Sequence, residues 1–242
     1  MMGKDFQFKQ FAVSQDRCAM KVGTDGVLLG AWAHGGARIL DIGTGTGIIA
    51  LMMAQRFPEA IVDAIEIDPG AAQQATENAA RSPFAERINV IETSLQHFEP
   101  DTRHSEIYYP DTHYNYIVTN PPFFSHSLKA PEESRRLARQ TDSLPFSAIF
   151  AFASQYLTPN GELSAIIPTD YLEEFSQEAF MRGMFLSRLY SVKTVERKPA
   201  KRTLVAFSPS RPTAFDKQEV VLIDKDGNKS AWYKKLTADF YL

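Results

Sequence analysis

Several features are scarce in this sequence, and each scarcity argues against a class of protein. Cys18 is the only cysteine among 242 residues, so no disulfide can form within the chain and a thiolate metal site is disfavoured. No uncharged apolar run reaches the roughly 20 residues of a transmembrane helix, and the N-terminal residues lack the apolar region of a signal peptide. We therefore expect a soluble, cytoplasmic protein.

An overall excess of charge is also missing, because the formal net charge is only −3 at pH 7. This balance argues against a global basic field for nucleic acid. Residues 182–211 nevertheless hold eight basic residues against one acidic residue, Glu196. Either they form a local face for an anionic polymer, or they are solvated charges that protect strand edges. The basic residues are Arg182, Arg188, Lys193, Arg197, Lys198, Lys201, Arg202 and Arg211.

Common catalytic motifs are absent as well. The sequence contains no Gly-x-Ser-x-Gly elbow of a hydrolase and no P-loop lysine. Its histidines show no spacing typical of metal ligands, so we expect no metal site. They are His34, His97, His104, His113 and His126.

Strand and helix patterns alternate in the first half of the chain. Thr24 or Asp25 is the predicted cap of the first helix, which ends near residue 35. This alternation is typical of an α/β protein with a Rossmann-like, doubly wound, mostly parallel sheet. The predicted strands cover 38–42, 61–67, 88–91 and 114–119, and further helices cover 48–57 and 69–81.

The second half is richer in strands, and a short strand is also predicted at 6–11. Asp226-Gly227-Asn228 is a strong turn signal, which predicts a hairpin between strands at 219–223 and 230–234. We therefore expect antiparallel strands at the C-terminal end. The other predicted elements are strands at 161–167, 185–195 and 203–207 and helices at 145–157 and 171–181.

A glycine-rich stretch, residues 41–47, follows the first buried strand and precedes a helix. Its glycines allow a backbone to approach a ligand closely at a helix N-terminus. Asp41 would repel a pyrophosphate, since like charges about 5 Å apart cost on the order of 3 kcal/mol at an effective dielectric near 20. The Gly-x-Gly-x-Gly spacing also differs from the Gly-x-Gly-x-x-Gly of dinucleotide folds. The loop therefore favours a ligand with an ammonium or sulfonium group.

The end of the second predicted strand carries Glu66. A carboxylate at this place is positioned to accept hydrogen bonds from two ribose hydroxyls, and Ile67 beside it can pack on an adenine face. Asp68 precedes Pro69 and is the predicted N-cap of the next helix. Glu66 and Ile67 are therefore predicted to bind a nucleoside.

The strand at 114–119 runs directly into Asn120-Pro121-Pro122-Phe123. Each proline removes a backbone N–H and keeps the preceding residue extended, so the loop is rigid and its carbonyls stay free to accept. The Asn120 amide oxygen and the Pro121 carbonyl suit the two hydrogens of a planar amine, and Phe123 offers a stacking face. The alternative is a plain proline turn with core aromatics.

These motifs occur in a fixed order along the chain, and together they resemble the class I S-adenosylmethionine-dependent methyltransferases that act on amino groups. The motifs are Asp41-Ile-Gly43-Thr-Gly45-Thr-Gly47, Ala64-Ile-Glu66-Ile-Asp68 and Asn120-Pro-Pro-Phe123. Residues 20–30 and 236–242 extend the resemblance over nearly the full length to the bacterial valine-tRNA adenine-N6 methyltransferases. Members of that family modify the adenine beside the anticodon.

The resemblance implies one methyltransferase domain over residues 1–242, with an N-terminal extension at 1–36 and a C-terminal hairpin at 215–242. It implies S-adenosyl-L-methionine as cofactor and a tRNA anticodon loop as substrate. Its implied catalytic residues are Asn120, Pro121, Pro122 and Phe123. Its implied cofactor-binding residues are Asp41, Gly43, Gly45, Gly47, Glu66, Ile67, Ser94, Leu95 and Asn120.

One departure from that family and one set of candidate RNA contacts complete the prediction. Ser94-Leu95 stands where many relatives carry an acidic residue that bonds the adenine amine, so the Ser94 hydroxyl or the Leu95 backbone would serve instead. The candidate RNA contacts are the basic segment 182–211 together with Arg135, Arg136 and Arg139.

Other activities remain open at this stage. A carboxamide would fit the Asn-Pro-Pro loop, so a protein-glutamine N5 methyltransferase is the main rival, and a ribosomal RNA guanine-N2 methyltransferase is another. From different classes, the chain could be a nucleotide-dependent oxidoreductase or a non-catalytic RNA-binding module.

Overall fold

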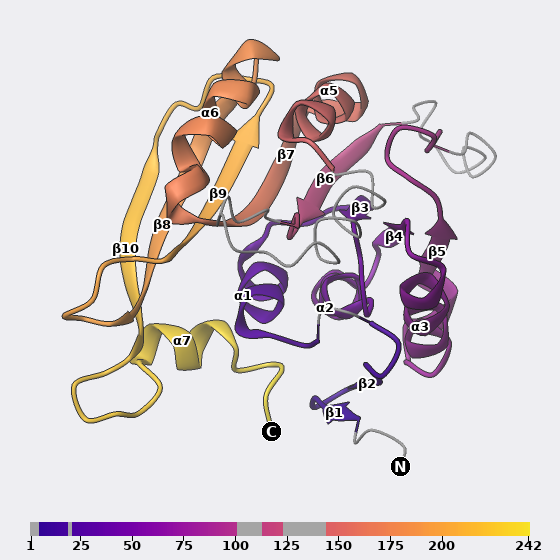
Figure 1. Cartoon of the computed structure of the whole chain (residues 1–242), viewed down its shortest axis with the longest axis horizontal. Helices are drawn as coiled ribbons and strands as arrows, with labels where there is room; N and C mark the ends of the chain where they lie inside the picture. Colours follow the sequence, from indigo (N-terminus) through magenta and orange to yellow (C-terminus); the bar gives the residue numbers. More distant parts are fainter. Residues whose placement is uncertain (1–4, 19–20, 101–112, 123–143) are drawn as a thin grey trace, which may run out of the picture.

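A mixed sheet organises the molecule in the computed structural model, which describes residues 5–18, 21–100, 113–122 and 144–242 (Figure 1). The strands run in parallel except for β9, which is antiparallel to both neighbours. The predicted Rossmann-like, mostly parallel architecture is therefore confirmed. In spatial order the strands are β10 (Asp216–Ile223), β8 (Phe185–Val195), β9 (Arg202–Ser208), β7 (Leu157–Pro168), β6 (Tyr114–Thr119), β3 (Arg38–Ile42), β4 (Ile61–Glu66) and β5 (Ile88–Glu92).

Helices cover both faces of this sheet (Figure 1). One face carries α1 (Thr24–Trp32), α2 (Ile48–Arg56) and α3 (Pro69–Ala80), and the other carries α5 (Phe146–Tyr156) and α6 (Leu172–Met181). Successive residues of β3 serve the two sides, since Ile39 packs in the core under α1 and α2 while Leu40 packs in the core under α5 and α6. Two 3-10 helices, η1 (Ala85–Arg87) and η2 (Thr169–Tyr171), precede β5 and α6.

The strand order reverses between β3 and β6. From β3 the chain continues outward to β4 and β5, and it then returns to place β6 on the other side of β3. Ligands of doubly wound α/β proteins bind at such a switch point, outside the carboxyl ends of the strands. The residues that follow β3 and β6 are Gly43 and Asn120, so the fold brings the two predicted loops to the same crevice.

The N-terminal part differs from the prediction in two places. Instead of one strand at 6–11, two short strands, β1 (Phe6–Gln7) and β2 (Ala12–Val13), pair antiparallel. The N-cap of α1 is the extended residue Gly23, without a side-chain cap, so the predicted cap at Thr24 or Asp25 is wrong. The Asp25 carboxylate instead accepts a hydrogen bond of 2.7 Å from Arg202 Nε.

The predicted C-terminal hairpin is also wrong. The turn exists, with Gly227 at φ 82°, but the pairing stops at a single bridge between Ile223 and Lys229. The expected second strand is helix α7 (Ala231–Leu236), because the Ser230 hydroxyl accepts the Tyr233 N–H and caps it. Strand β10 pairs with β8 instead, and it does so in parallel. Of the C-terminal strands of this sheet, only β9 runs antiparallel to its neighbours, as was expected for this region.

In the part of the chain that the structure describes, no helix is both long and apolar enough to cross a membrane.

Candidate active site

The glycine loop after β3 is built from left-handed backbone. Gly43, Gly45 and Gly47 have φ of 71°, 56° and 81°, which side chains with a Cβ rarely adopt. A Cβ on Gly43 or Gly45 would meet open space, whereas a Cβ on Gly47 would lie 3.3 Å from Ala75 Cβ. The first two glycines therefore leave room for a ligand, and the third allows the loop to approach α3 closely.

Asp41 lies beneath this loop and is completely buried. Its Oδ2 accepts hydrogen bonds from Thr44 Oγ1 at 2.6 Å and from the Ala50 N–H at 3.2 Å, so it ties β3 to the loop and to the first turn of α2. Within the described residues, Oδ1 is buried and has no hydrogen-bond partner. Burial, with a smaller contribution from Glu66, raises the pKa of Asp41 to about 7 despite the two hydrogen bonds. A nearby cation would stabilise the charged form.

Glu66 connects the glycine loop to the turn between β4 and α3. Its Oε2 accepts the Gly45 N–H at 2.8 Å, and its Oε1 accepts the N–H groups of Ile67 and Asp68 at 2.9 and 3.0 Å. Ile67 beside it is 42% exposed. The prediction that Asp68 caps α3 is confirmed, since its Oδ1 accepts the Ala71 N–H at 2.7 Å. A partly exposed carboxylate and an exposed apolar side chain thus stand together at the end of β4.

Ser94 and Leu95 follow β5, next to the end of β4. The Thr93 N–H donates to the Glu66 carbonyl, which holds this segment against the Glu66 turn. Leu95 is buried in the core under α5, so its side chain is not available to a ligand. The Ser94 hydroxyl lies 3.1 Å from His97 Nδ1 and is partly exposed.

Asn120 follows β6 at the switch point. The register pairs Thr119 with Ile42, and Thr119 Oγ1 donates to the Ile42 carbonyl at 3.0 Å. Strand alternation, continued by the extended conformation that Pro121 imposes, puts Asn120 on the same face as Val118 and Asp41. Asn120 is partly exposed, Pro121 is buried and Pro122 is exposed. Phe123 lies outside the described residues.

The basic segment 182–211 is divided between structural pairs and exposed charges. Arg188 pairs with Glu162, Lys193 with Glu219 at 2.6 Å, and Arg202 with Asp25. Arg211 lies over the Phe185 ring at 5.1 Å. By contrast, Arg197, Lys198 and Lys201 are exposed in the turn between β8 and β9. Arg135, Arg136 and Arg139 lie outside the described residues.

Three of the exposed cations lie together in a basic turn, residues 196–201, whereas Arg182 and Arg211, also exposed, lie outside it. Because β8 runs in the same direction as β7 and β6, its carboxyl end lies at the same edge of the sheet as Asn120 and Gly43. Figure 1 shows this turn at the lower end of β8 and β9. Three cations therefore extend the edge that carries the switch point.

Two buried amides near the site were not predicted from the sequence. Asn78 and Gln74, both on α3, are 0% and 1% exposed. Their spacing of four residues within an alanine-rich helix, which puts both on one helix face, was the available signal. Among the described residues, no group of three or more His, Cys, Asp or Glu side chains could hold a metal ion.

Comparison with known families agrees with this geometry. The family model of the methyltransferase small domain matches residues 22–185, which include the glycine loop, Glu66 and the Asn-Pro-Pro segment. The chain belongs to this family. Family membership therefore favours a methyltransferase over the two other classes that the sequence left open, an oxidoreductase and a non-catalytic RNA-binding module.

Full-length relatives of this methyltransferase have a common name, tRNA1(Val) (adenine(37)-N6)-methyltransferase. The protein of Bacteroides fragilis is 45% identical and covers 98% of this chain and 97% of its own length. Those of Porphyromonas gingivalis and Tolumonas auensis are 42% and 40% identical, over 98% and 100% of this chain and 94% and 98% of their own.

Solved structures share the fold of this methyltransferase. A predicted O-methyltransferase from Agrobacterium tumefaciens superposes with a TM-score of 0.65 at 21% identity, covering 89% of this chain and 96% of its own. The CcbJ methyltransferase of Streptomyces caelestis gives 0.53 at 12% identity, covering 76% and 94%. Family and fold agree with the expected cofactor, S-adenosyl-L-methionine. The Asp41 oxygen that has no partner among the described residues and the open space at Gly43 and Gly45 fit a cationic nucleoside.

Proposed function

We propose that this methyltransferase transfers the methyl group of S-adenosyl-L-methionine to the exocyclic N6 amine of the adenine beside the anticodon of valine tRNA. The observation that carries the proposal is that Asn120-Pro121-Pro122 and the glycine loop follow the ends of the paired strands β6 and β3, at the switch point of the sheet. The common name of the full-length relatives supports the choice of an adenine in this tRNA.

The acceptor loop orients the amine. The Asn120 amide oxygen and the Pro121 carbonyl each accept one N–H of N6, so the nitrogen lone pair points in a single direction, toward the glycine loop. An amine conjugated to a purine is a weak nucleophile, and the two acceptors polarise its N–H bonds as positive charge develops on nitrogen. Phe123 stacks on the base after it has been turned out of the anticodon loop, an interaction worth roughly 1–3 kcal/mol.

The cofactor supplies a methyl group bonded to a positively charged sulfur. Asp41 and Glu66 would hold the two ends of this molecule, with Asp41 near its charged part and Glu66 at the ribose hydroxyls, and Ile67 would pack on the adenine. When bound, the cofactor would supply this methyl group to the N6 lone pair, and its sulfur would be left as a neutral thioether. The methylated nitrogen then loses one proton to solvent, and no strong base is required.

The basic turn contributes to RNA binding. Arg197, Lys198 and Lys201 are exposed and extend from the edge that holds Asn120, whereas Arg188, Lys193 and Arg202 are engaged in ion pairs. Each lysine or arginine that contacts a phosphate releases counterions, so binding weakens as salt rises. Replacing all three exposed residues with alanine should raise the KM for tRNA and reduce the salt dependence of binding, without changing the KM for the cofactor.

Transfer of tritium from labelled S-adenosylmethionine tests the substrate assignment. We expect label in tRNA from a strain lacking this gene, and N6-methyladenine in the digested nucleosides by mass spectrometry. A release factor or ribosomal RNA incubated in parallel should stay unlabelled. Label in the release factor alone would assign the enzyme to protein glutamine instead. Asn120→Asp serves as a matched variant, because it keeps an acceptor oxygen but introduces a charge next to the reacting atoms.

A further inference from the structure

A buried asparagine joins two segments that lie far apart in the sequence. Asn78 on α3 is 0% exposed. Its Nδ2 donates to the Ser14 carbonyl and to the Thr46 carbonyl, both at 2.9 Å. Its Oδ1 accepts the Ser14 N–H at 2.9 Å and Arg81 Nη2 at 2.7 Å. One amide therefore holds the N-terminal segment and the glycine loop in fixed relation to each other.

The N-terminal segment continues from this point along α3, and we refer to residues 14–18 as the strap. Gln74 Oε1, which is also buried, accepts the Arg17 N–H at 3.3 Å, and Arg17 Nη1 forms an ion pair with Glu77 at 2.7 Å. A Cβ built on Gly70 would lie 3.6 Å from the Arg17 carbonyl oxygen. The strap thus runs from Asn78 to the first turn of α3, which begins directly after the Glu66 turn.

The end of the strap lies beside the Glu66 turn, because a Cβ built on Gly70 would lie 3.6 Å from the Arg17 carbonyl oxygen and 3.2 Å from Asp68 Oδ1. Cys18 is buried, and its burial, together with the charges of Glu66, Asp68 and Asp16, raises the pKa of its thiol to about 11. The charges of Glu66 and Asp68 agree with this placement, which rests on the contacts around Gly70. Glu66 is the proposed ribose-binding carboxylate, so the strap ends beside the nucleoside half of the cofactor site.

We propose that the strap forms the outer wall of the nucleoside half of the cofactor site, and that Asn78 is the positioning residue that aligns this wall with the glycine loop. The inference rests on the proposed role of Glu66 in holding the cofactor. The amide is required because it donates to both segments at once, and an aspartate of the same size lacks those donors. A leucine would leave the Ser14 and Thr46 carbonyls without their partner.

Steady-state kinetics test the positioning role. In Asn78→Ala, the KM for S-adenosylmethionine should rise about tenfold, while kcat and the KM for tRNA stay within about twofold of the parent. Gln74→Leu, which loosens the strap without touching the glycine loop, should raise the same KM by about threefold. Thr76→Ala is the control, because Thr76 lies on the same helix but is exposed. An unchanged cofactor KM in both folded variants would overturn the proposal.

The single cysteine of the chain gives a second readout that needs no RNA. S-adenosylhomocysteine should slow the reaction of Cys18 with a thiol reagent by at least about tenfold in the parent protein, and by less than about threefold in Asn78→Ala. A chain carrying Cys18→Ser and Leu189→Cys places the thiol in the core under α5 and α6 and reports global opening. Equal protection of both thiols, or no protection of Cys18, would contradict the wall.

These experiments separate the inference from the proposed function. If S-adenosylhomocysteine protects Cys18 but tRNA is not methylated, the tRNA substrate is wrong and the proposal for the strap stands. If tRNA is methylated but Cys18 is not protected, the proposal for the strap is wrong and the substrate stands.

Discussion

One face of the sheet carries two buried carboxylates, one near the carboxyl ends of the strands and one nearer their amino ends. The two differ in their hydrogen-bond partners and in the direction of their pKa shifts. Asp41 lies near the carboxyl end of β3, under the glycine loop, and one of its oxygens has no partner among the described residues. Glu162 lies on β7, level with Tyr116 and Ile39, nearer the amino ends of the strands. Both are less than a tenth exposed.

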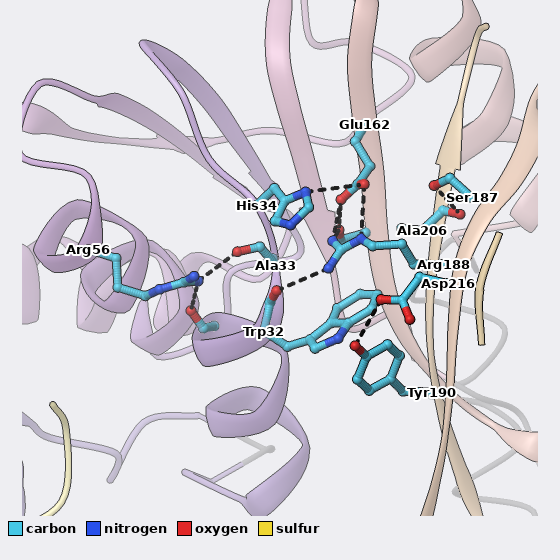
Figure 2. Close-up of polar contacts among 12 residues, drawn as sticks. Trp32, Ala33, His34, Arg56, Glu162, Ser187, Arg188, Tyr190, Ala206 and Asp216 are labelled. Carbon is cyan, nitrogen blue, oxygen red and sulfur yellow. Dashed lines mark hydrogen bonds and ion pairs between the residues drawn. The ribbon is translucent and has the colours of Figure 1, made fainter. Parts of the chain in front are cut away.

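Figure 2 shows how completely Glu162 is satisfied. Arg188 donates to its two oxygens at 2.5 and 3.1 Å, Ser164 Oγ donates at 2.8 Å, and His34 Nδ1 lies 3.5 Å away. The Arg188 guanidinium also lies 3.8 Å from the centre of the Trp32 ring. Burial disfavours the charge, but the hydrogen bonds and charges of His34 and Arg188 outweigh it and lower the pKa of Glu162 to about 2.

The comparison separates a structural carboxylate from a functional one. A buried charge is tolerated when bonded cations surround it, and Glu162 meets that condition within the protein itself. Within the described part of the chain, Asp41 has no bonded cation, and its pKa is raised. A bound cation would therefore stabilise its charged form. Four predictions test this contrast, in order of decreasing effect.

Removing Glu162 should have the largest effect, and the effect should be on stability. Glu162→Gln leaves Arg188, whose side chain is only 11% exposed, without its counter-charge, which costs about 3–5 kcal/mol in the free energy of unfolding. Urea titration measures it. The matched control is Glu219→Gln, which removes the partner of Lys193 in a more exposed pair and should cost less than about 1 kcal/mol. An equal loss of stability in the two variants would show that the Glu162–Arg188 pair contributes no more than the more exposed Lys193–Glu219 pair.

Asn120→Ala should reduce turnover without affecting stability or cofactor affinity. We expect kcat to fall by about 100- to 1000-fold, because the N6 hydrogens lose an acceptor that acts as charge develops. The Kd of S-adenosylhomocysteine, measured by calorimetry, should stay within about threefold. A parallel loss of affinity and turnover would show that Asn120 acts in the cofactor site rather than on the amine.

Asp41→Asn should weaken cofactor binding while stabilising the empty protein. The Kd of S-adenosylmethionine should rise about tenfold. A raised pKa in the folded state means that the stability Asp41 provides is present at low pH and is lost as pH rises through about 7. The neutral amide should therefore increase the free energy of unfolding at about pH 8 by on the order of 1–2 kcal/mol. Lower stability at that pH, measured by denaturant titration, would contradict the assigned cost of the charge.

Cofactor affinity should also depend on pH in one direction. A cation near Asp41 favours its ionised form, so the Kd of S-adenosylmethionine should fall several-fold as pH rises from about 6 to about 8. Glu66 is the other carboxylate acting on Asp41. The dependence should disappear in Asp41→Asn and persist in Glu162→Gln. A pH profile that is the same in all three proteins would assign the titration to another group.

Local signals account for what the sequence predicted correctly. Glycines at alternate positions between a strand and a helix predicted the loop. Gly43, Gly45 and Gly47 have left-handed φ values, which explains why the loop needs glycine at these positions. Asp68 before Pro69 predicted a helix start, and this signal is also local, since an N-cap depends on residues within one turn. The C-terminal turn was predicted from Asp226-Gly227-Asn228, yet what followed it was not.

The amino-acid sequence by itself therefore determined the loop types and most strand positions, because these depend on backbone preferences of neighbouring residues. Only the tertiary structure decided the parallel pairing of β10 with β8, the Glu162–Arg188 pair and the hold of Asn78 on Ser14 and Thr46. In each case the partners are far apart in the sequence, and their interaction exists only because the packed sheet and helices remove them from water together.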